Sequence, residues 1–359
     1  MIKRRATREV AVGNVLVGGE APVSIQSMTN TFTADYKSTI DQINEIYRAG
    51  GELVRVAVPD EEALNALDVI VASSPIPVIA DIHFKHELAL KALDKNVAKL
   101  RINPGNFGGT ERLLQVADKA GQKGVPLRIG VNAGSLERKI YKFRGEASPE
   151  ALVESALKYI RVLEGVGFLD IIVSVKAADA AATFQAFQLL AQEVNYPFHI
   201  GVTEAGPLYR GMVKSAVGIG SLLMNGVGDT IRVSLTADPV EEIKAARLIL
   251  QAAGIRYFGP DLVSCPTCGR CEIDVAGLAG EVEEIMEKME KPFKIAVMGC
   301  VVNGPGEGRE ADLGVTGTSR EGIIFKHGEI IRRVPRESLL KAFKEELTKL
   351  SGNSGGENN

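Results

Sequence analysis

Residues 148–176 read SPEALVESALKYIRVLEGVGFLDIIVSVK and combine one helix with one strand. The first part, SPEALVESALKYIRVLEGVG, has the apolar spacing of an amphipathic helix, and it ends at a glycine, as helices commonly do. The run that follows, DIIVSVK, is a short β-rich strand that becomes polar toward its end. Helices that alternate with buried strands are typical of α/β proteins with a parallel sheet.

Runs of the same kind recur from about Pro22 to Gly254, and helical segments separate them. The eight runs are PVSIQSM (22–28), LVRVAV (53–58), PVIADIH (77–83), KLRINP (99–104), LRIGVN (127–132), DIIVSVK (170–176), FHIGVTE (198–204) and DTIRVSL (229–235). Eight βα units predict an α/β fold, a closed (β/α)8 or TIM barrel, in a first domain at 1–254. A doubly wound open sheet is the alternative, but it would use fewer strands, and no GxGxxG motif follows the first run.

Polar residues gather near the carboxyl ends of these runs. They are Arg55, Asp81, His83, Arg101, Asn103, Arg128, Asn132, Ser174, Lys176, Glu204, Arg232 and Ser234. Where one run carries two of them, their spacing of two or four residues places both on the same face of the strand. In a barrel that face is the lumen, and enzymes of this fold keep their active sites at its carboxyl end.

The charges in this set are unbalanced. Five side chains are cationic (Arg55, Arg101, Arg128, Lys176, Arg232) and two are acidic (Asp81, Glu204), in a chain whose net charge is −3. Unpaired buried charges are costly, so the excess predicts an anionic ligand, and the guanidinium forks favour a diphosphate. Ion pairs that only stabilise the barrel are the alternative interpretation.

Two further patterns near this set are weaker. The segment GIGSLLMNGVGD (218–229) could open a short helix whose amides face a phosphate. His83, His86 and Asp81 suggest a metal site, but no third ligand on another strand supports one. We expect His83 to form a hydrogen bond with the substrate or with a neighbouring loop.

Composition excludes several classes of protein. The chain is 45% hydrophobic and 24% charged, as globular domains are, and its net charge of −3 gives no general attraction for nucleic acid or anionic lipid. Its amino-terminal residues lack an apolar signal region, and no run approaches a membrane span. We therefore expect a soluble, cytoplasmic protein with no nucleic-acid partner and no membrane partner.

The cysteines are confined to the remaining part of the chain. Cys265, Cys268 and Cys271 lie in CPTCGRC, and Cys300 follows a hydrophobic run. We expect a small α+β domain at 255–350 and a disordered tail at 351–359. The cysteine spacing favours a [4Fe–4S] cluster over structural zinc, and the three clustered cysteines need not all bind it. Glu307 is a candidate oxygen ligand, and a carboxylate suits an iron that must open to a substrate.

Several motifs together resemble the 4-hydroxy-3-methylbut-2-enyl diphosphate synthase family. They are CPTCGRC (265–271), MGCVVNGPGEG (298–308), ADLGVTG (311–317) and the barrel motifs SIQSMTNT, VIADIHF, KLRINPGN and RIGVN. The similarity covers nearly the whole chain and corresponds to the two-domain form of the family. It implies reductive ring opening of 2-C-methyl-D-erythritol 2,4-cyclodiphosphate in isoprenoid biosynthesis, with two electrons delivered singly.

The resemblance also implies roles for individual residues. Cys265, Cys268, Cys300 and Glu307 would bind the cluster, and Cys271 would be a neighbouring thiol. The substrate contacts would include Arg55, Arg101, Arg128, Asn132, Lys176, Arg232 and Ser234, and Glu204 would handle a proton or bind a hydroxyl group. Ferredoxin or flavodoxin would donate electrons, and a homodimer would share each active site between its subunits.

Two other functions compete with this one. A pterin-dependent barrel transferase with a structural zinc domain would also carry Asp, Asn, Lys and Arg at its strand ends, but it leaves the cysteine domain unexplained. A zinc-ribbon protein that binds RNA is disfavoured by the net charge of −3 and by the lack of a basic and aromatic stripe.

Overall fold

A computed structural model describes residues 2–352, apart from Phe84, Phe107, 137–147, Lys288, 302–305 and Glu307. The chain divides into two compact units, one that ends at Arg256 and one that begins at Tyr257.

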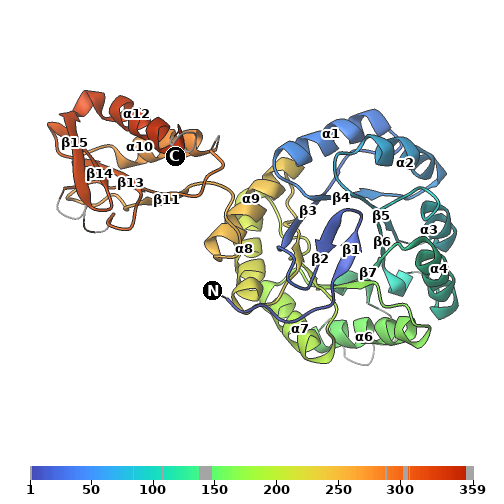
Figure 1. The fold of residues 1–359 in the computed structure, drawn as a ribbon. Coiled ribbons are helices and arrows are strands. Elements are labelled where there is room, and N and C mark those ends of the chain that lie inside the picture. The colour runs from blue at the N-terminus through green and yellow to red at the C-terminus, as the bar shows by residue number, and fades with distance from the viewer. Residues whose placement is uncertain are drawn as a thin grey trace, which may run out of the picture. The chain divides into compact units, whose positions relative to one another are not determined.

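The first unit is the expected TIM barrel (Figure 1). Its strands are β3 (Ser24–Met28), β4 (Leu53–Ala57), β5 (Val78–Ile82), β6 (Lys99–Ile102), β7 (Leu127–Asn132), β8 (Ile171–Lys176), β9 (His199–Ile200) and β10 (Thr230–Ile231). These strands pair in parallel in the order β8-β7-β6-β5-β4-β3-β10-β9. A parallel bridge between Val173 and Phe198 joins β8 to the start of β9, so the barrel is nearly closed.

Helices surround the barrel on its outer face (Figure 1). They are α1 (Tyr36–Arg48), α2 (Glu61–Ser73), α3 (His86–Ala92), α4 (Thr110–Lys123), α6 (Pro149–Gly165), α7 (Ala180–Glu193), α8 (Leu208–Met224) and α9 (Pro239–Ala252). Side chains cap several helices at their first turn: Ser148 accepts a hydrogen bond from the amide of Ala151, and Asp238 accepts one from the amide of Val240. Both helices also have proline at the start, which suits a position without an amide partner.

Two of the eight runs form shorter strands than expected. β9 ends at Ile200 and β10 ends at Ile231, so the residues after them follow irregular paths at the mouth of the barrel. Glu204, Arg232 and Ser234 therefore lie beyond their strands, and alternation along a strand does not fix where their side chains point.

A hairpin that precedes the barrel closes its amino-terminal end. β1 (Val10–Val12) pairs antiparallel with β2 (Val15–Val17), and Figure 1 shows the hairpin across the opening of the barrel. Its buried valines pack on Leu53, Ile79 and Ile172 from inside the barrel. The polar lumen is thus sealed by apolar contacts at this end.

The interpretation of residues 218–229 as a phosphate-binding helix start was wrong. Gly218 and Gly220 lie within α8 and are buried, far from its first turn. A Cβ on Gly218 would lie 2.5 Å from Val202 Cγ2, so this glycine lets α8 pack closely against the segment after β9.

The second unit is a five-stranded mixed sheet covered by helices. Its elements are β11 (Asp261–Ser264), α10 (Val275–Met286), β12 (Lys294–Val297), β13 (Leu313–Gly317), β14 (Glu321–Lys326), β15 (Glu329–Pro335) and α12 (Leu339–Gly352). The strand order is β11-β12-β13-β14-β15, parallel up to β13 and antiparallel after it. Val282, Val297 and Phe343 belong to the core between sheet and helices. In the described part of the chain, no helix has the length and apolar character to cross a membrane.

Candidate functional site

The polar residues chosen from the strand ends are mostly buried inside the barrel. Arg55, Asp81, Arg101, Arg128, Ser174 and Lys176 are in strands and Asn103 directly follows β6; each is at most 8% exposed. Asn132 ends β7 and is half-buried, as are Arg232 and Ser234 beyond β10. The strand register sets Arg101 beside Asp81 on one side and beside Arg128 on the other. The barrel therefore brings most of the chosen residues into one lumen.

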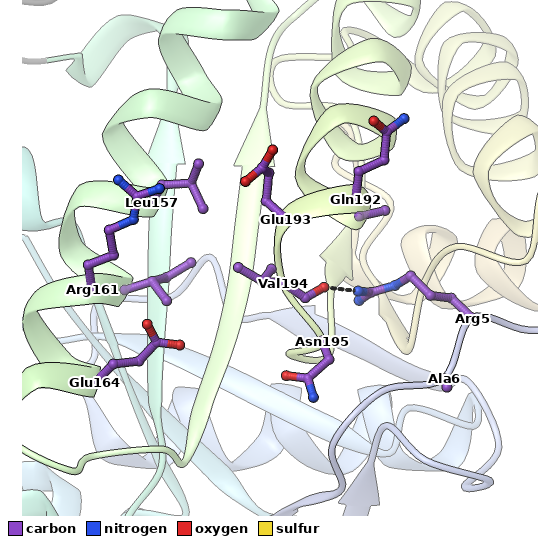
Figure 2. Close-up of a pocket in the computed structure, with 11 residues that line it drawn as sticks. Arg5, Ala6, Leu157, Arg161, Glu164, Gln192, Glu193, Val194 and Asn195 are labelled. Atoms are coloured by element: carbon purple, nitrogen blue, oxygen red, sulfur yellow. Dashed lines mark hydrogen bonds between the residues drawn. The ribbon is translucent and has the colours of Figure 1, made fainter.

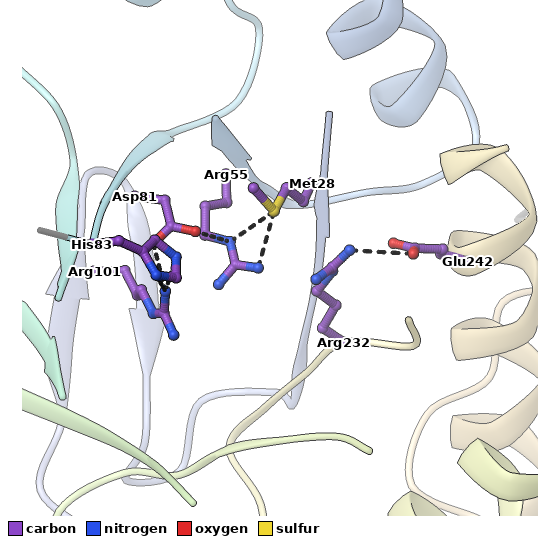
Figure 3. Close-up of polar contacts among 7 residues, drawn as sticks. All are labelled: Met28, Arg55, Asp81, His83, Arg101, Arg232 and Glu242. Atoms are coloured by element: carbon purple, nitrogen blue, oxygen red, sulfur yellow. Dashed lines mark hydrogen bonds and ion pairs between the residues drawn. The ribbon is translucent and has the colours of Figure 1, made fainter. Parts of the chain in front are cut away.

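Asp81 is the centre of a charge network in this lumen (Figure 3). Its Oδ1 accepts a hydrogen bond from Arg101 Nη1 at 2.9 Å, and its Oδ2 lies 3.4 Å from Arg55 Nε. His83 contacts Asp81 and the Arg101 guanidinium. Burial raises the pKa of Asp81, but Arg55, His83 and Arg101 together hold it well below its usual value. Asp81 thus stays ionised and holds two arginines in place.

A second acid, Glu242, was missed by the sequence argument. It lies in the first turn of α9, is 4% exposed, and its Oε1 is 3.3 Å from Arg232 Nη2. Its other oxygen accepts a hydrogen bond from Ser27. Glu242 lies outside the strands, and a glutamate in the first turn of a helix usually indicates only a favourable interaction with the helix dipole.

Arg128 lacks such a partner. It is 3% exposed, and its Nε and Nη1 have no hydrogen-bond partner among the described residues. Burial lowers the pKa of Arg128 well below its usual value, and the neighbouring Arg55 and Arg101 lower it further. Burial and the same kind of neighbours lower the pKa of Lys176. Both side chains lie where an anion would relieve their repulsion.

Arg55 has a carboxylate partner, but its charge is only partly offset. Its guanidinium contacts Met28 Sδ at 3.0 and 3.2 Å as well as Asp81 (Figure 3). Burial lowers the pKa of Arg55 to about 9, Asp81 offsets part of this effect, and Arg232 and Arg101 add to it. One carboxylate does not neutralise the cations around it.

Two glycines make room for the cationic side chains. A Cβ on Gly130 of β7 would lie 2.9 Å from Arg101 Nε, and a Cβ on Gly201 would lie 2.7 Å from Lys176 Nζ. Gly130 lies two residues after Arg128 and two before Asn132, so its position faces the lumen as theirs do. The absence of side chains there allows Arg101 and Lys176 to extend across the lumen.

Glu204 is separate from this network. It is exposed, has φ of 53°, and forms no hydrogen bond or ion pair with the described residues. A left-handed backbone is uncommon for glutamate and is often found at functional sites. Glu242 is therefore the second acid in the described lumen, and the prediction that Glu204 would be that acid was wrong.

The four cysteines of the second unit are free thiols. The amide of Gly299 donates a hydrogen bond to Cys265 Sγ at 3.1 Å, and the neighbouring Cys300 is buried. The Cys271 thiol donates to the carbonyl of Ile273 at 3.1 Å, while Cys268 is exposed. A Cβ on Gly299 would lie within 3.4 Å of the sulfurs of both Cys265 and Cys271. Only glycine fits between these sulfurs.

These thiols suit a soft metal centre in their chemistry. An amide that donates to a cysteine sulfur stabilises the thiolate that iron requires. Among the residues that the structure describes, no three Cys, His, Asp or Glu side chains already form a metal-binding group. Glu307, the expected oxygen ligand, lies outside the described residues.

A separate cavity of about 470 Å³ lies on the outside of the barrel between α6, the end of α7 and the amino-terminal segment (Figure 2). Arg5 lines it, but its guanidinium donates to the carbonyls of Val194 and Tyr196. None of the residues predicted from the sequence lines this cavity, so it is separate from the lumen site.

A parallel β/α barrel whose described lumen holds an excess of cations, followed by a unit with free cysteines, defines a TIM-barrel protein with a thiol-containing second domain. The GcpE TIM-barrel domain matches residues 7–247, and the GcpE protein C-terminal domain matches residues 261–349. The chain belongs to the GcpE family.

Relatives match nearly the entire chain. One from Caldanaerobacter subterraneus subsp. tengcongensis is 50% identical over 98% of this chain and 99% of its own length. One from Clostridium acetobutylicum is 52% identical over 96% of this chain and 99% of its own length. Both are named 4-hydroxy-3-methylbut-2-en-1-yl diphosphate synthase (flavodoxin). The family expected from the motifs is confirmed, and the pterin transferase alternative is not favoured.

Among solved structures, 3-dehydroquinate dehydratase from Geobacillus kaustophilus is similar, with a TM-score of 0.51 and 15% identity, over 69% of this chain and 98% of that one. At this identity the similarity concerns the barrel fold alone.

Proposed function

We propose that this chain is a 4-hydroxy-3-methylbut-2-en-1-yl diphosphate synthase of isoprenoid biosynthesis. It opens the ring of 2-C-methyl-D-erythritol 2,4-cyclodiphosphate, removes the C3 oxygen and forms (E)-4-hydroxy-3-methylbut-2-enyl diphosphate. The reaction takes up two electrons and two protons and releases water. The observation that carries the proposal is 50–52% identity to synthases of that name over nearly the whole chain.

The lumen residues explain how the substrate would be held. Arg128 and Lys176 would bind the diphosphate directly, since their charges are not balanced by the described carboxylates. Arg55 and Arg101 would add to this site, held in position by Asp81. Charge accumulates on the diphosphate as the ring C–O bond breaks, and cations already in place stabilise it without reorganising.

Neutral polar residues would position the rest of the substrate. Asn103 and Ser174 are buried in the lumen, while Asn132 and Ser234 lie at its rim. Their hydroxyl and amide groups suit the hydroxyl groups of the sugar-derived carbon chain. Glu204, exposed at the mouth, would transfer a proton or bind a substrate hydroxyl.

The second unit would hold a [4Fe–4S] cluster through Cys265, Cys268, Cys300 and Glu307. Bound there, the cluster would supply electrons one at a time and a Lewis-acidic iron. Cys271 would remain outside the ligand set, because its thiol already donates to the Ile273 carbonyl. The amide of Gly299 would stabilise the Cys265 thiolate.

The electrons would come from flavodoxin or ferredoxin. Flavodoxin is part of the printed name of the relatives, and this sequence has no nicotinamide or flavin fingerprint of its own. We expect the protein in the cytoplasm, where these carriers are found.

We also propose a homodimer whose subunits share each active site. An apolar surface on α8 and α9 supports self-association: Val213, Val217, Met224 and Leu248 are each more than half exposed. A groove of about 350 Å³ accompanies them. Exposed apolar patches of this kind mark association surfaces in soluble proteins.

Binding of the cyclic diphosphate by anaerobic, cluster-loaded protein tests the proposed function. We expect saturable binding that Arg128→Ala weakens about a hundredfold, a cost of roughly 2.7 kcal/mol, with unchanged iron content. A dihydropterin should not compete. Binding of the pterin, with no binding of the cyclic diphosphate, would reject the proposal in favour of the transferase.

A second observable concerns the cluster. Anaerobically purified protein should be brown, with broad absorbance at about 400 nm, and Glu307→Ala should keep part of the iron but lose most turnover. Colourless protein that contains one zinc ion per chain would contradict the cluster assignment.

A further inference from the structure

A lysine lies deeper in the lumen than the arginines. Lys99 begins β6, two residues before Arg101, so both side chains project from the same face of the strand. Lys99 has no exposed surface, and its Nζ has no hydrogen-bond partner among the described residues. Neither the sequence argument nor the proposed substrate contacts give this residue a role.

The charged groups that affect the pKa of Lys99 are cationic. Arg128 of β7 and Arg55 of β4 repel the charged form of Lys99, and Lys99 in turn disfavours the charged form of His199 on β9. Burial, Arg128, Arg232 and Arg55 likewise lower the pKa of Lys176 on β8. Burial lowers the pKa of Lys99 well below its usual value, and Arg128 and Arg55 lower it further.

The buried carboxylates that the structure describes in the barrel are already engaged, and Asp229 contacts Arg4. Asp81 contacts Arg55 and Arg101, and Glu242 contacts Arg232 and Ser27. His199 does not offset the charge either, since burial and the cations around it, Lys176 and Arg128 first, lower its pKa. A lysine kept only for stability would have a carboxylate partner, because an unpaired buried amine opposes folding.

We propose that Lys99 is a proton-linked counter-charge for the bound diphosphate: its amine takes up one proton from solvent when the anionic substrate enters the lumen. This inference rests on the proposed function. In the empty barrel, burial and the neighbouring arginines favour the neutral amine, which adds no repulsion to the arginine cluster. Once the diphosphate contributes negative charge, the ammonium form becomes favourable. Lys99 then attracts the ligand electrostatically from a position deeper in the lumen than the arginines.

The balance of this step is simple. The Lys99 amine and one solvent proton give the ammonium group, and the buffer becomes one proton poorer for each ligand bound. No bond in the substrate changes and no electron moves. Substrate binding should therefore weaken as the pH rises, because a proton is taken up in the complex.

Calorimetry can count this proton. Anaerobic, cluster-loaded protein without reductant would be titrated with the cyclic diphosphate at pH 7.5, in buffers that differ in ionisation enthalpy. For the wild type, the binding heat should depend on the buffer with a slope of about one proton taken up. Lys99→Gln, which keeps a polar side chain but cannot titrate, should lose this slope and bind about tenfold more weakly.

The matched control is Lys123→Gln, which removes an exposed lysine of α4 and should keep both slope and affinity. His199→Gln tests a second titratable group of this region and should also keep the slope. A second variant, Lys99→Met, removes the buried amine with similar volume. Without ligand it should unfold at a higher temperature than the wild type, whereas loss of a structural lysine would lower that temperature.

Each outcome separates the two proposals. If the wild type binds the cyclic diphosphate without proton uptake, the role of Lys99 is wrong and the proposed function remains. The same holds if Lys99→Gln keeps the slope or if His199→Gln removes it. If the wild type does not bind the cyclic diphosphate at all, the proposed function fails and this inference fails with it.

Discussion

Asp81 determines how the cationic residues of the lumen are arranged. It is 3% exposed and contacts the guanidinium groups of Arg55 and Arg101. Because desolvation makes an isolated buried charge unfavourable, each of these groups depends on the others. Asp81 and Glu242 together leave a surplus of positive charge in the described lumen, and this surplus favours an anionic ligand.

Asp81→Asn should destabilise the protein by about 3–5 kcal/mol at pH 7, since it leaves two buried arginines without their counter-charge. The folded-state pKa of Asp81 is lower than its unfolded value of about 4. Its contribution is therefore complete above that value and is lost as the pH falls below it. Urea unfolding at pH 7 and at about pH 3 measures this.

The matched control is Asp118→Asn on α4, where the carboxylate is exposed. It should change the free energy of unfolding little at either pH. A difference between wild type and Asp81→Asn that stays constant down to low pH would show that the carboxylate charge is not what stabilises the site.

Much of the residue set could be predicted because alternation along a strand fixes the face of each side chain. This reasoning succeeds for Arg101 and Arg128, which are inside regular strands. It fails for Glu242, because a helix residue can reach the lumen only through tertiary packing. It also misses Lys99, because a lysine at the start of a strand is usually exposed to solvent.

The strands position the side chains of the site, and glycines in and after them leave room for those side chains. β7 illustrates both, since Arg128 and Asn132 project from it and Gly130 between them leaves space for Arg101. β9 and β10 could not be predicted at their observed lengths. Their pairing partners, and not their own composition, decide where regular hydrogen bonding stops.

Gly130→Ala should reduce affinity for the cyclic diphosphate about tenfold, because its methyl group would displace the Arg101 side chain. The free energy of unfolding should also fall, since the displaced Arg101 is buried and contacts Asp81. Gly121→Ala is the control: its methyl group would meet Phe168 only at ordinary contact distance, 3.7 Å. Equal affinity for both variants and the wild type would mean that Arg101 does not contribute to binding.

The hairpin β1–β2 gave no signal in the sequence argument because its runs are only three residues long. It seals the barrel end opposite the site, and Val12 is fully buried there. Val12→Ala should lower the free energy of unfolding by about 2 kcal/mol, with unchanged ligand affinity. Leu16→Ala, at an exposed position of the same hairpin, should be nearly neutral; an equal loss for both would mean that the hairpin is not a specific plug.

At the scale of the whole molecule, the proposed chemistry needs both units. The barrel carries the anion site and the second unit carries the thiols, so neither could complete the reaction alone. The sequence predicts this division because cysteines are confined to the second part. For the proposed homodimer, it does not predict which subunit's second unit serves a given barrel, since that depends on contacts between subunits.

Mixing two inactive variants tests the shared active site. Arg128→Ala impairs the barrel and Cys300→Ser impairs the cluster ligands, so each homodimer should be inactive. If sites are shared between subunits, re-assembled mixtures should regain about a quarter of the wild-type sites by random pairing. Activity that stays at the level of the separate variants would mean that each chain uses its own second unit.

Anaerobic turnover tests the central claim most directly. Cluster-loaded protein with flavodoxin or a chemical reductant should convert 2-C-methyl-D-erythritol 2,4-cyclodiphosphate to 4-hydroxy-3-methylbut-2-enyl diphosphate, identified by mass spectrometry, and Arg128→Ala with the same iron content should convert far less. Iron-loaded, reduced wild-type protein that leaves the cyclic diphosphate unchanged would contradict the account.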